Sequence, residues 1–130
     1  MSNPLLVRHV MMSNFKKLEG VTKVYDALAM MKEEGINAVL IQPRNEKDVY
    51  GIMTLKDIAR KVIGERRKLH ETHVYEIMSK PVVAVNPQMD IRYCTRLFDN
   101  FGLSRAPVID NKKIVGLVSY SDIVLKGLKV

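Results

Sequence analysis

The sequence has little of what builds disulfide frameworks, metal centres or membrane spans. Among its 130 residues Cys94 is the single cysteine, which excludes an internal disulfide and a cysteine metal cage. The three histidines, His9, His70 and His73, lack the spacing of a metal site. Apolar runs such as Ala38–Ile41 are far shorter than the roughly 20 residues of a membrane-spanning helix. With one thiol and no recognisable signal peptide, the expected location is a reducing cytoplasm.

Signatures of catalysis are also missing from the sequence. It contains no glycine-rich phosphate loop, no nucleophile paired with a base, and no paired carboxylates with a clear role. We therefore expect no enzymatic activity and no catalytic cofactor.

The chain contains an internal repeat, which is the first feature to establish in such a sequence. Residues 7–11 align with residues 74–78 at an offset of 67. Further along, residues 51–58 align with residues 116–123 at an offset of 65, because the first copy has a loop two residues longer. One gap reconciles both halves, so we infer a duplication. Its parts are repeat 1 over residues 7–63, a connector over 64–73 and repeat 2 over 74–128.

The hydrophobic pattern predicts the same element order, β-α-β-β-α, in both repeats. In repeat 1 we expect strands at 15–18, 38–41 and 49–53, and helices at 22–34 and 54–63. In repeat 2 we expect strands at 82–85, 107–109 and 114–118, and helices at 90–101 and 119–128. The fold class is therefore α+β. Since helices on one face leave the other face of each sheet uncovered, we expect the repeats to pack sheet to sheet with pseudo-two-fold symmetry.

Both repeats carry the pattern Gly-apolar-x-Thr/Ser-x-x-Asp-Ile. In one interpretation Thr54 with Asp57, and Ser119 with Asp122, are capping boxes. Such caps would stabilise each helix by about 1 kcal/mol. In the other, the helix N-terminus and the hydroxyl bind a phosphate, and the aspartate accepts from both hydroxyls of a ribose. The residues alone leave both interpretations open.

These motifs resemble those of the CBS (cystathionine β-synthase) domain, and the tandem is similar to a CBS pair, or Bateman module. The matching segments are Val10–Met11, Val49–Ile58, Val74–Ser79, Gly102–Asp110 and Val115–Ile123. The resemblance covers nearly the whole chain, although Ala38–Ile41 lacks the usual proline of the family. It implies a regulatory module for an adenosine-containing ligand: AMP, ADP, ATP, NAD or S-adenosylmethionine. It also implies a homodimer formed through helices, which signals to a separate target protein.

The resemblance further implies two ligand clefts between the copies, each with its ribose aspartate from one copy and its adenine pocket from the other. Cleft one is expected to contain Thr54, Asp57, Met78, Val82, Val83, Leu103, Ser104 and Arg105. Cleft two is expected to contain Met11, Phe15, Lys16, Ile36, Asn37, Ala38, Ser119 and Asp122. Arg105 matches a phosphate-contacting position of the family, and its alternative is an exposed surface arginine. In repeat 1 the position equivalent to Arg105 holds Ala38, which has no charge to contact a phosphate. Cleft one should therefore be the better formed. In cleft two, Lys16 is the expected phosphate partner.

The formal net charge of +7 favours an anionic partner. A basic cluster surrounds the connector: Arg60, Lys61, Arg66, Arg67 and Lys68. It is either a solvated helix end or a surface for phosphates or an acidic partner. Nucleic acid is not favoured, because no aromatic-rich basic motif accompanies the charge. The alternative to a ligand sensor is a protein-interaction scaffold without ligand, in which the Thr/Ser–Asp pairs are only caps.

Overall fold

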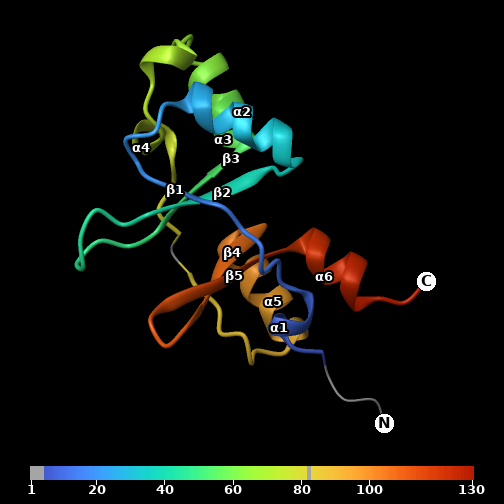
Figure 1. The fold of residues 1–130 in the computed structure, drawn as a ribbon. Helices are drawn as coiled ribbons and strands as arrows, with labels where there is room; N and C mark the ends of the chain where they lie inside the picture. The colour runs from blue at the N-terminus through green and yellow to red at the C-terminus, as the bar shows by residue number, and fades with distance from the viewer. Residues whose placement is uncertain (1–4, 82) are drawn as a thin grey trace. The chain divides into compact units, whose positions relative to one another are not determined.

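Two compact units make up the fold, and each combines parts of both repeats. The computed structural model describes residues 5–81 and 83–130. Unit 2 is Lys16–Pro81, and unit 1 holds the described residues up to Phe15 together with those from Val83 onward. Figure 1 follows the chain from blue to red through the start of unit 1, then unit 2, then the rest of unit 1.

Unit 2 is built on a three-stranded sheet with the strand order β1-β2-β3. The strands are β1 (Lys17–Leu18), β2 (Ala38–Ile41) and β3 (Gly51–Thr54). β1 runs parallel to β2, and β2 runs antiparallel to β3, with Ala38 opposite Thr54 and Ile41 opposite Gly51. Every residue of β2 is buried, as its uninterrupted apolar run predicts for a central strand.

The helices of unit 2 are α2 (Val24–Glu34), α3 (Leu55–Ile58), its π-helical continuation Ala59–Ile63, a 3₁₀ turn at Leu69–Glu71, and α4 (Val74–Ile77). Helices and strands share one core: Val24, Ala27, Met31, Val39, Ile41, Met53, Ile58, Val62, Val74 and Ile77. α2 ends at Gly35, whose φ of 67° lies in the left-handed region that glycine adopts without steric cost.

Unit 1 is built on the hairpin of β4 (Arg105–Asp110) and β5 (Lys113–Ser119). Its turn residues, Asn111 and Lys112, have φ values of 50° and 66°, which is the geometry whose twist suits a two-residue hairpin loop. The helices α1 (Val7–Val10), α5 (Ile91–Phe101) and α6 (Tyr120–Gly127) complete the unit. The core of unit 1 is Val7, Val10, Val85, Cys94, Phe98, Ala106, Val108, Val118 and Ile123. None of the helices within residues 5–81 and 83–130 could span a bilayer.

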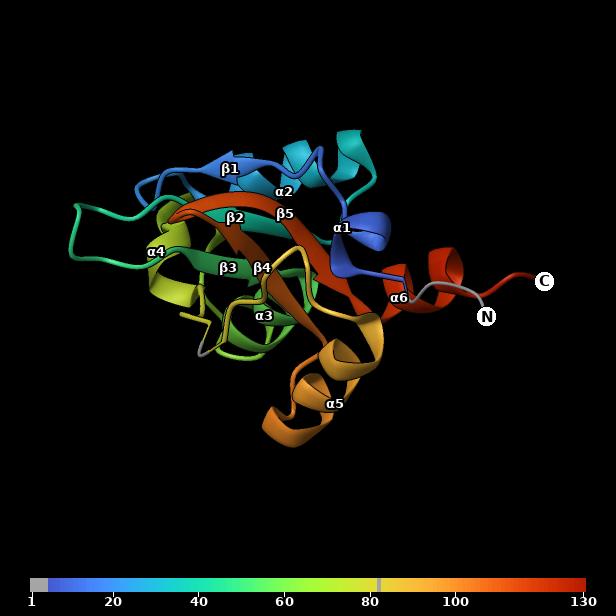
Figure 2. The same cartoon turned by 90° about the horizontal axis from the view of Figure 1, so that it is seen from below.

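The first segment of each repeat packs in the unit that holds the rest of the other repeat. In unit 1, the Met12 N–H donates to Leu117 O at 2.8 Å and the Leu117 N–H donates to Met12 O at 3.0 Å. In unit 2, Ile52 and Ser79 make the equivalent pair, at 2.8 and 2.9 Å. α1 contacts α6, from which it is distant in sequence, and the two lie close together in Figure 2. The exchange is therefore reciprocal, and each unit draws its core from both repeats.

The predicted α+β class is confirmed, and a few elements differ from expectation. Val82, in the predicted strand 82–85, lies outside the described residues, and of the rest only Val85 makes a bridge, to Val108. The predicted strand 15–18 is reduced to β1, and the predicted helix 54–63 becomes π-helical at Ala59. A hydrophobic run predicts burial, and Val85 is indeed buried. The run does not predict how many of its residues form backbone hydrogen bonds with a neighbouring strand. The packing of the repeats sheet to sheet remains a prediction.

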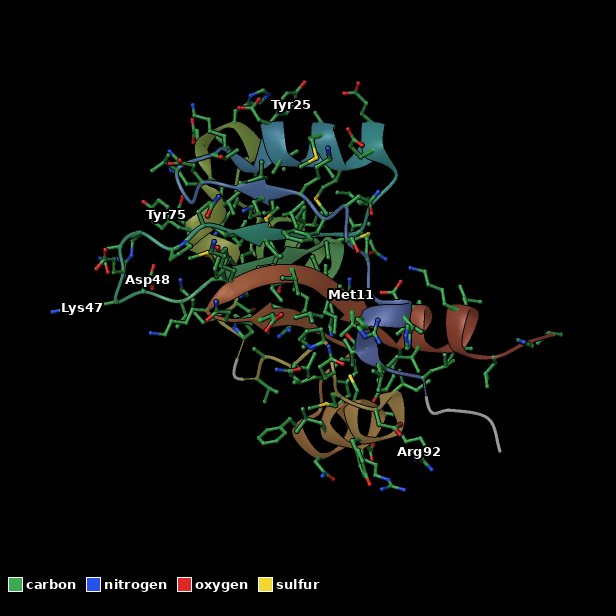
Figure 3. The ribbon with its side chains drawn as sticks, turned by 60° about the horizontal axis from the view of Figure 1, so that its bottom comes forward. Met11, Tyr25, Lys47, Asp48, Tyr75 and Arg92 are labelled. Carbon is green, nitrogen blue, oxygen red and sulfur yellow. The ribbon has the colours of Figure 1, made fainter. Side chains whose placement is uncertain are left out.

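The long loop between β2 and β3 is fastened by Asp48, which Figure 3 labels. Its side chain is 10% exposed and accepts from the Arg44 N–H at 2.9 Å and from Lys80 Nζ at 3.1 Å. Lys80 also donates to Val49 O. The backbone N–H of Arg44, and next the ammonium of Lys80, hold the pKa of Asp48 well below its usual range.

Asp48 should make the fold sensitive to acid. Because its pKa is depressed in the folded state, the carboxylate stabilises the fold above the unfolded-state pKa of about 3.9, and that contribution is lost as the pH falls further. We expect the Tm of the wild-type protein to fall more steeply than that of Asp48→Asn between about pH 5 and pH 3. Differential scanning fluorimetry measures both slopes, with Asp26→Asn, an exposed position of α2, as the control. Equal slopes for wild type and Asp48→Asn would contradict this role.

Candidate functional site

Both Thr/Ser–Asp pairs of the repeated motif form complete capping boxes. Thr54 Oγ1 accepts from the Asp57 N–H at 3.1 Å, and Asp57 Oδ2 accepts from the Thr54 N–H at 2.9 Å. Ser119 Oγ and Asp122 Oδ2 accept in the same way, at 3.2 and 3.0 Å. In each box the hydroxyl also donates to Oδ2, at 3.1 Å in the first and 2.9 Å in the second. The capping interpretation is thus confirmed, and any ribose contact falls to the other carboxylate oxygen, Oδ1.

The two aspartates differ at Oδ1. Among the described residues, Asp57 Oδ1 has no hydrogen-bond or ion-pair partner. Asp122 Oδ1 instead lies 3.4 Å from Lys126 Nζ, one turn later in α6. The sequence prediction missed this pair, although the i,i+4 spacing of opposite charges signals it. A ligand hydroxyl could therefore donate freely to Oδ1 of Asp57, whereas at Asp122 it would compete with the Lys126 ammonium for Oδ1.

In unit 2 the start of β2 borders the cap of α3. The first N–H of the helix, that of Leu55, donates to Asn37 O at 3.1 Å. The N–H of Asp57 is held by the cap, and between them the Lys56 N–H has no partner among the described residues. The predicted residues Ile36–Ala38 thus lie beside the cap of their own repeat, next to one unpaired donor.

Unit 1 repeats this arrangement around the cap of α6. The Tyr120 N–H donates to Ser104 O at 3.1 Å, and Arg105 lies opposite Ser119 in the hairpin. In the described part of the chain the Ser121 N–H is left without a partner. Residues 103–105 therefore border the second cap, in the same unit.

Packing explains the glycine that opens each motif. A Cβ on Gly51 would lie 2.6 Å from Met78 Sδ, and a Cβ on Gly116 would lie 2.6 Å from Met11 Sδ. Since real Cβ contacts are not that short, a larger residue would displace the methionine. Met78 and Met11 are both predicted adenine-pocket residues, and each is placed by a glycine three positions before the cap.

The structure distributes the predicted site residues over both units. Unit 2 contains Lys16, Ile36, Asn37, Ala38, Thr54, Asp57 and Met78. Unit 1 contains Met11, Phe15, Val83, Leu103, Ser104, Arg105, Ser119 and Asp122. Val82 lies outside the described residues. Each predicted cleft draws on both units, so the composition of the whole clefts stays a prediction. Lys16 Nζ lies 3.8 Å from Glu34 Oε1, so a phosphate at Lys16 would compete with Glu34.

The caps have a measurable structural role. Ser119→Ala removes the acceptor of the Asp122 N–H, and we expect the free energy of unfolding to fall by about 1 kcal/mol. Ser121→Ala, at an exposed hydroxyl of the same helix, should change it by less than about 0.5 kcal/mol. Urea denaturation of both variants gives the comparison. Equal stabilities would show that the cap contributes nothing.

The chain belongs to the CBS domain family. The model of the CBS domain matches it twice, over residues 7–64 and 74–128, so two such domains stand in tandem. This agrees with the two units, each with one capped helix after an antiparallel strand pair.

Relatives and solved structures extend this comparison. The uncharacterized protein MK0525 of Methanopyrus kandleri is 36% identical over 96 residues, which cover 72% of this chain and 48% of that protein. The chain therefore spans about half the length of this relative. The hexameric CBS-CP12 protein from bloom-forming cyanobacteria is 39% identical with a TM-score of 0.89, over 96% of this chain and 69% of that one. The CBS domain pair of protein MJ0100, in complex with 5′-methylthioadenosine and S-adenosyl-L-methionine, is 23% identical with a TM-score of 0.80 over 95% of each chain. At this identity MJ0100 shows the fold.

Proposed function

We propose that this protein is a regulatory module that binds an adenosine-containing ligand, AMP, ADP or ATP, at its two capped helices and signals to a separate protein. NAD and S-adenosylmethionine share the adenosine and are the next candidates. The observation that carries the proposal is that both caps leave ligand-binding groups open. Asp57 keeps Oδ1, and Lys56 and Ser121 keep an N–H, among the described residues. The MJ0100 pair, whose structure is a complex with two adenosine compounds, supports this ligand class.

Each of these unpaired groups is assigned a contact with the ligand. Oδ1 of Asp57 accepts from ribose hydroxyls, and the unpaired N–H groups, at positive helix ends, donate to phosphate oxygens. At Asp122 the ribose must share the carboxylate with Lys126, so we expect weaker binding there. The phosphates of the bound ligand would draw basic side chains together. This would shift the population of relative orientations of the two CBS domains, which is the proposed signal.

Analysis of the small molecules that purify with the protein tests this proposal. Denaturing the purified protein and examining the released compounds by mass spectrometry should give an adenosine compound at a defined stoichiometry. The absence of any such compound, together with no saturable binding of the five candidates, would overturn the proposal. Such a negative result would favour a protein-interaction scaffold without ligand, because both capping boxes are already complete within the protein.

We propose that the protein is not an enzyme and works in the cytoplasm. Cys94, the single thiol, is fully buried, and burial raises its pKa to about 11, so it is no nucleophile. An assay for phosphate release from ATP should give no activity above background. Release that depends on Thr54 would overturn the assignment.

We also propose a homodimer that forms through helix faces. On α6 and at the residue that ends it, large apolar surface is exposed by Val124, Leu125 and Leu128, with Leu125 at 79%. On the π-helical turn after α3, Ile63 is 75% exposed. Apolar faces of this kind mark association surfaces. Sedimentation should give a dimer for the wild type and for Lys129→Glu, and a monomer for Leu125→Lys. A wild-type monomer at all concentrations would contradict the proposal.

A further inference from the structure

A cavity of about 540 Å³ opens in unit 2, at the end of the sheet remote from the cap of α3. Its walls come from the segments that follow β1 and β2 and from α4. These segments lie at the end of the sheet where Ile41 is opposite Gly51, whereas Thr54, the cap, lies opposite Ala38 at the other end. None of the residues predicted for the two adenosine clefts lines this cavity. A ligand bound in this cavity would therefore be separate from the adenosine ligand.

The apolar wall of the cavity is formed by Tyr75 and its neighbours. The Tyr75 N–H donates to Gly20 O at 3.0 Å, and a Cβ on Gly20 would lie 3.2 Å from Tyr75 Cβ, so the tyrosine is seated directly on the glycine. The Tyr75 ring also stacks on His73, with 5.5 Å between ring centroids. Even so, Tyr75 is 53% and Val21 70% exposed. Exposed apolar surface beside a cavity is typical of a ligand site.

The charged wall of the cavity contains one oriented cation and one anion. Arg44 Nε lies 3.3 Å from Asp48 Oδ2, and Asp48 is itself nine-tenths buried and held by Lys80. The Arg44 side chain is 80% exposed, so its terminal Nη groups are open to solvent. Glu19 is exposed as well, and it forms no ion pair within residues 5–81 and 83–130. Figure 3 shows Tyr75 on the same side of unit 2 as the loop that carries Asp48.

We propose that this cavity binds a free α-amino acid with an aromatic or large aliphatic side chain. The Nη groups of Arg44 present a planar fork that matches a carboxylate, and the Glu19 carboxylate accepts from the ammonium group. The ligand side chain packs on Tyr75 and Val21. A volume of about 540 Å³ falls in the range of small-molecule sites. A ligand of one charge would leave either Glu19 or Arg44 unmatched, so a zwitterion fits this pair best.

Isothermal titration calorimetry of the full chain with L-phenylalanine tests the assignment. We expect saturable binding at one site, weakened about tenfold or more in both Arg44→Gln and Glu19→Gln, since each loses a charge-assisted hydrogen bond. Lys47→Gln is the matched control: it removes a cation from the same loop, where Figure 3 shows Lys47 pointing away from the protein, and should bind like wild type. Thermal melts of all three variants should match wild type, because the altered side chains are exposed.

Two analogues of the probe separate the two charges. Phenethylamine lacks the carboxylate and 3-phenylpropanoate lacks the ammonium, so both should bind at least about tenfold more weakly than L-phenylalanine. Binding of either analogue as tight as that of the amino acid would overturn the zwitterion assignment. Absence of saturable binding by all three compounds, or equal affinity in wild type, Arg44→Gln and Glu19→Gln, would overturn the site. AMP binding should be the same in these variants as in wild type, because no lining residue of the cavity belongs to a cap or to a predicted adenosine cleft.

Discussion

Replacing Asp57 with asparagine is expected to weaken the binding of the adenosine ligand by about 100-fold while the fold stays nearly as stable. A hydrogen bond to a charged group is worth about 1.5–3 kcal/mol, and the two ribose hydroxyls would lose one each. Asparagine keeps a carbonyl oxygen that can still accept from the Thr54 N–H, so the cap survives. At the place of Oδ1, however, the amide presents a donor where the ribose needs an acceptor.

Isothermal titration calorimetry separates the two roles of Asp57. Wild type and Asp57→Asn are titrated with whichever of AMP, ADP, ATP, NAD and S-adenosylmethionine binds the wild type. Asp99→Asn, an exposed aspartate of α5, should bind with wild-type affinity. An Asp57→Asn protein of unchanged affinity would show that the aspartate is only a cap. Asp122→Asn should have a smaller effect, because Lys126 already engages that carboxylate.

Replacing Phe98 with alanine is expected to lower the free energy of unfolding by about 3–5 kcal/mol, which is a large part of the stability of a small domain. Phe98 is fully buried in the core of unit 1 and packs edge-on against Tyr120, with 5.2 Å between ring centroids. That core includes Val7 and Val10 of the first repeat. The cavity left by the ring would therefore weaken contacts with both ends of the chain.

Urea denaturation measures the effect of Phe98→Ala. Phe101→Ala is the matched control, since Phe101 lies in the same helix and is 55% exposed. We expect Phe101→Ala to cost less than about 1 kcal/mol. Similar losses for the two variants would contradict the placement of Phe98 in the core.

Local features of the fold could be predicted because neighbouring residues determine them. The spacing of apolar residues predicted the helix at 90–101, which the structure shows as α5, ending at Gly102 with a left-handed φ of 64°. The two predicted strands 107–109 and 114–118 located the hairpin of unit 1 and the turn between them. The exchange of first segments could not be predicted in this way. Val7 and Val74 occupy equivalent positions, so their side chains would suit either core, and pattern alone does not say which repeat each one joins.

In the candidate site, too, contacts between residues close in the sequence could be predicted, and the exact contacts between distant residues could not. The repeated Thr/Ser and Asp identified both caps, because a capping box joins residues three positions apart. The pairing of the two apolar runs 38–41 and 49–53 could be predicted, but the exact register that sets Ala38 opposite Thr54 could not, because the loop between the strands is long. The clasp of Asp48 on Lys80 joins residues 32 positions apart and was missed for the same reason. Two members of the basic cluster around the connector have partners within the protein. Arg67 pairs with Glu76 at 3.1 Å, and Lys61 donates to Ile77 O at 3.0 Å.

A thermal-shift titration of the wild-type protein shows directly whether the folded chain binds an adenosine-containing ligand. A ligand that binds only the folded chain raises stability by RT ln(1 + [L]/Kd), so the Tm should keep rising with the logarithm of ligand concentration above Kd. AMP, ADP, ATP, NAD and S-adenosylmethionine are each added up to millimolar concentration. We expect such a rise for at least one of them, and its loss in the Asp57→Asn, Asp122→Asn double variant. An unchanged Tm with all five would contradict this expectation.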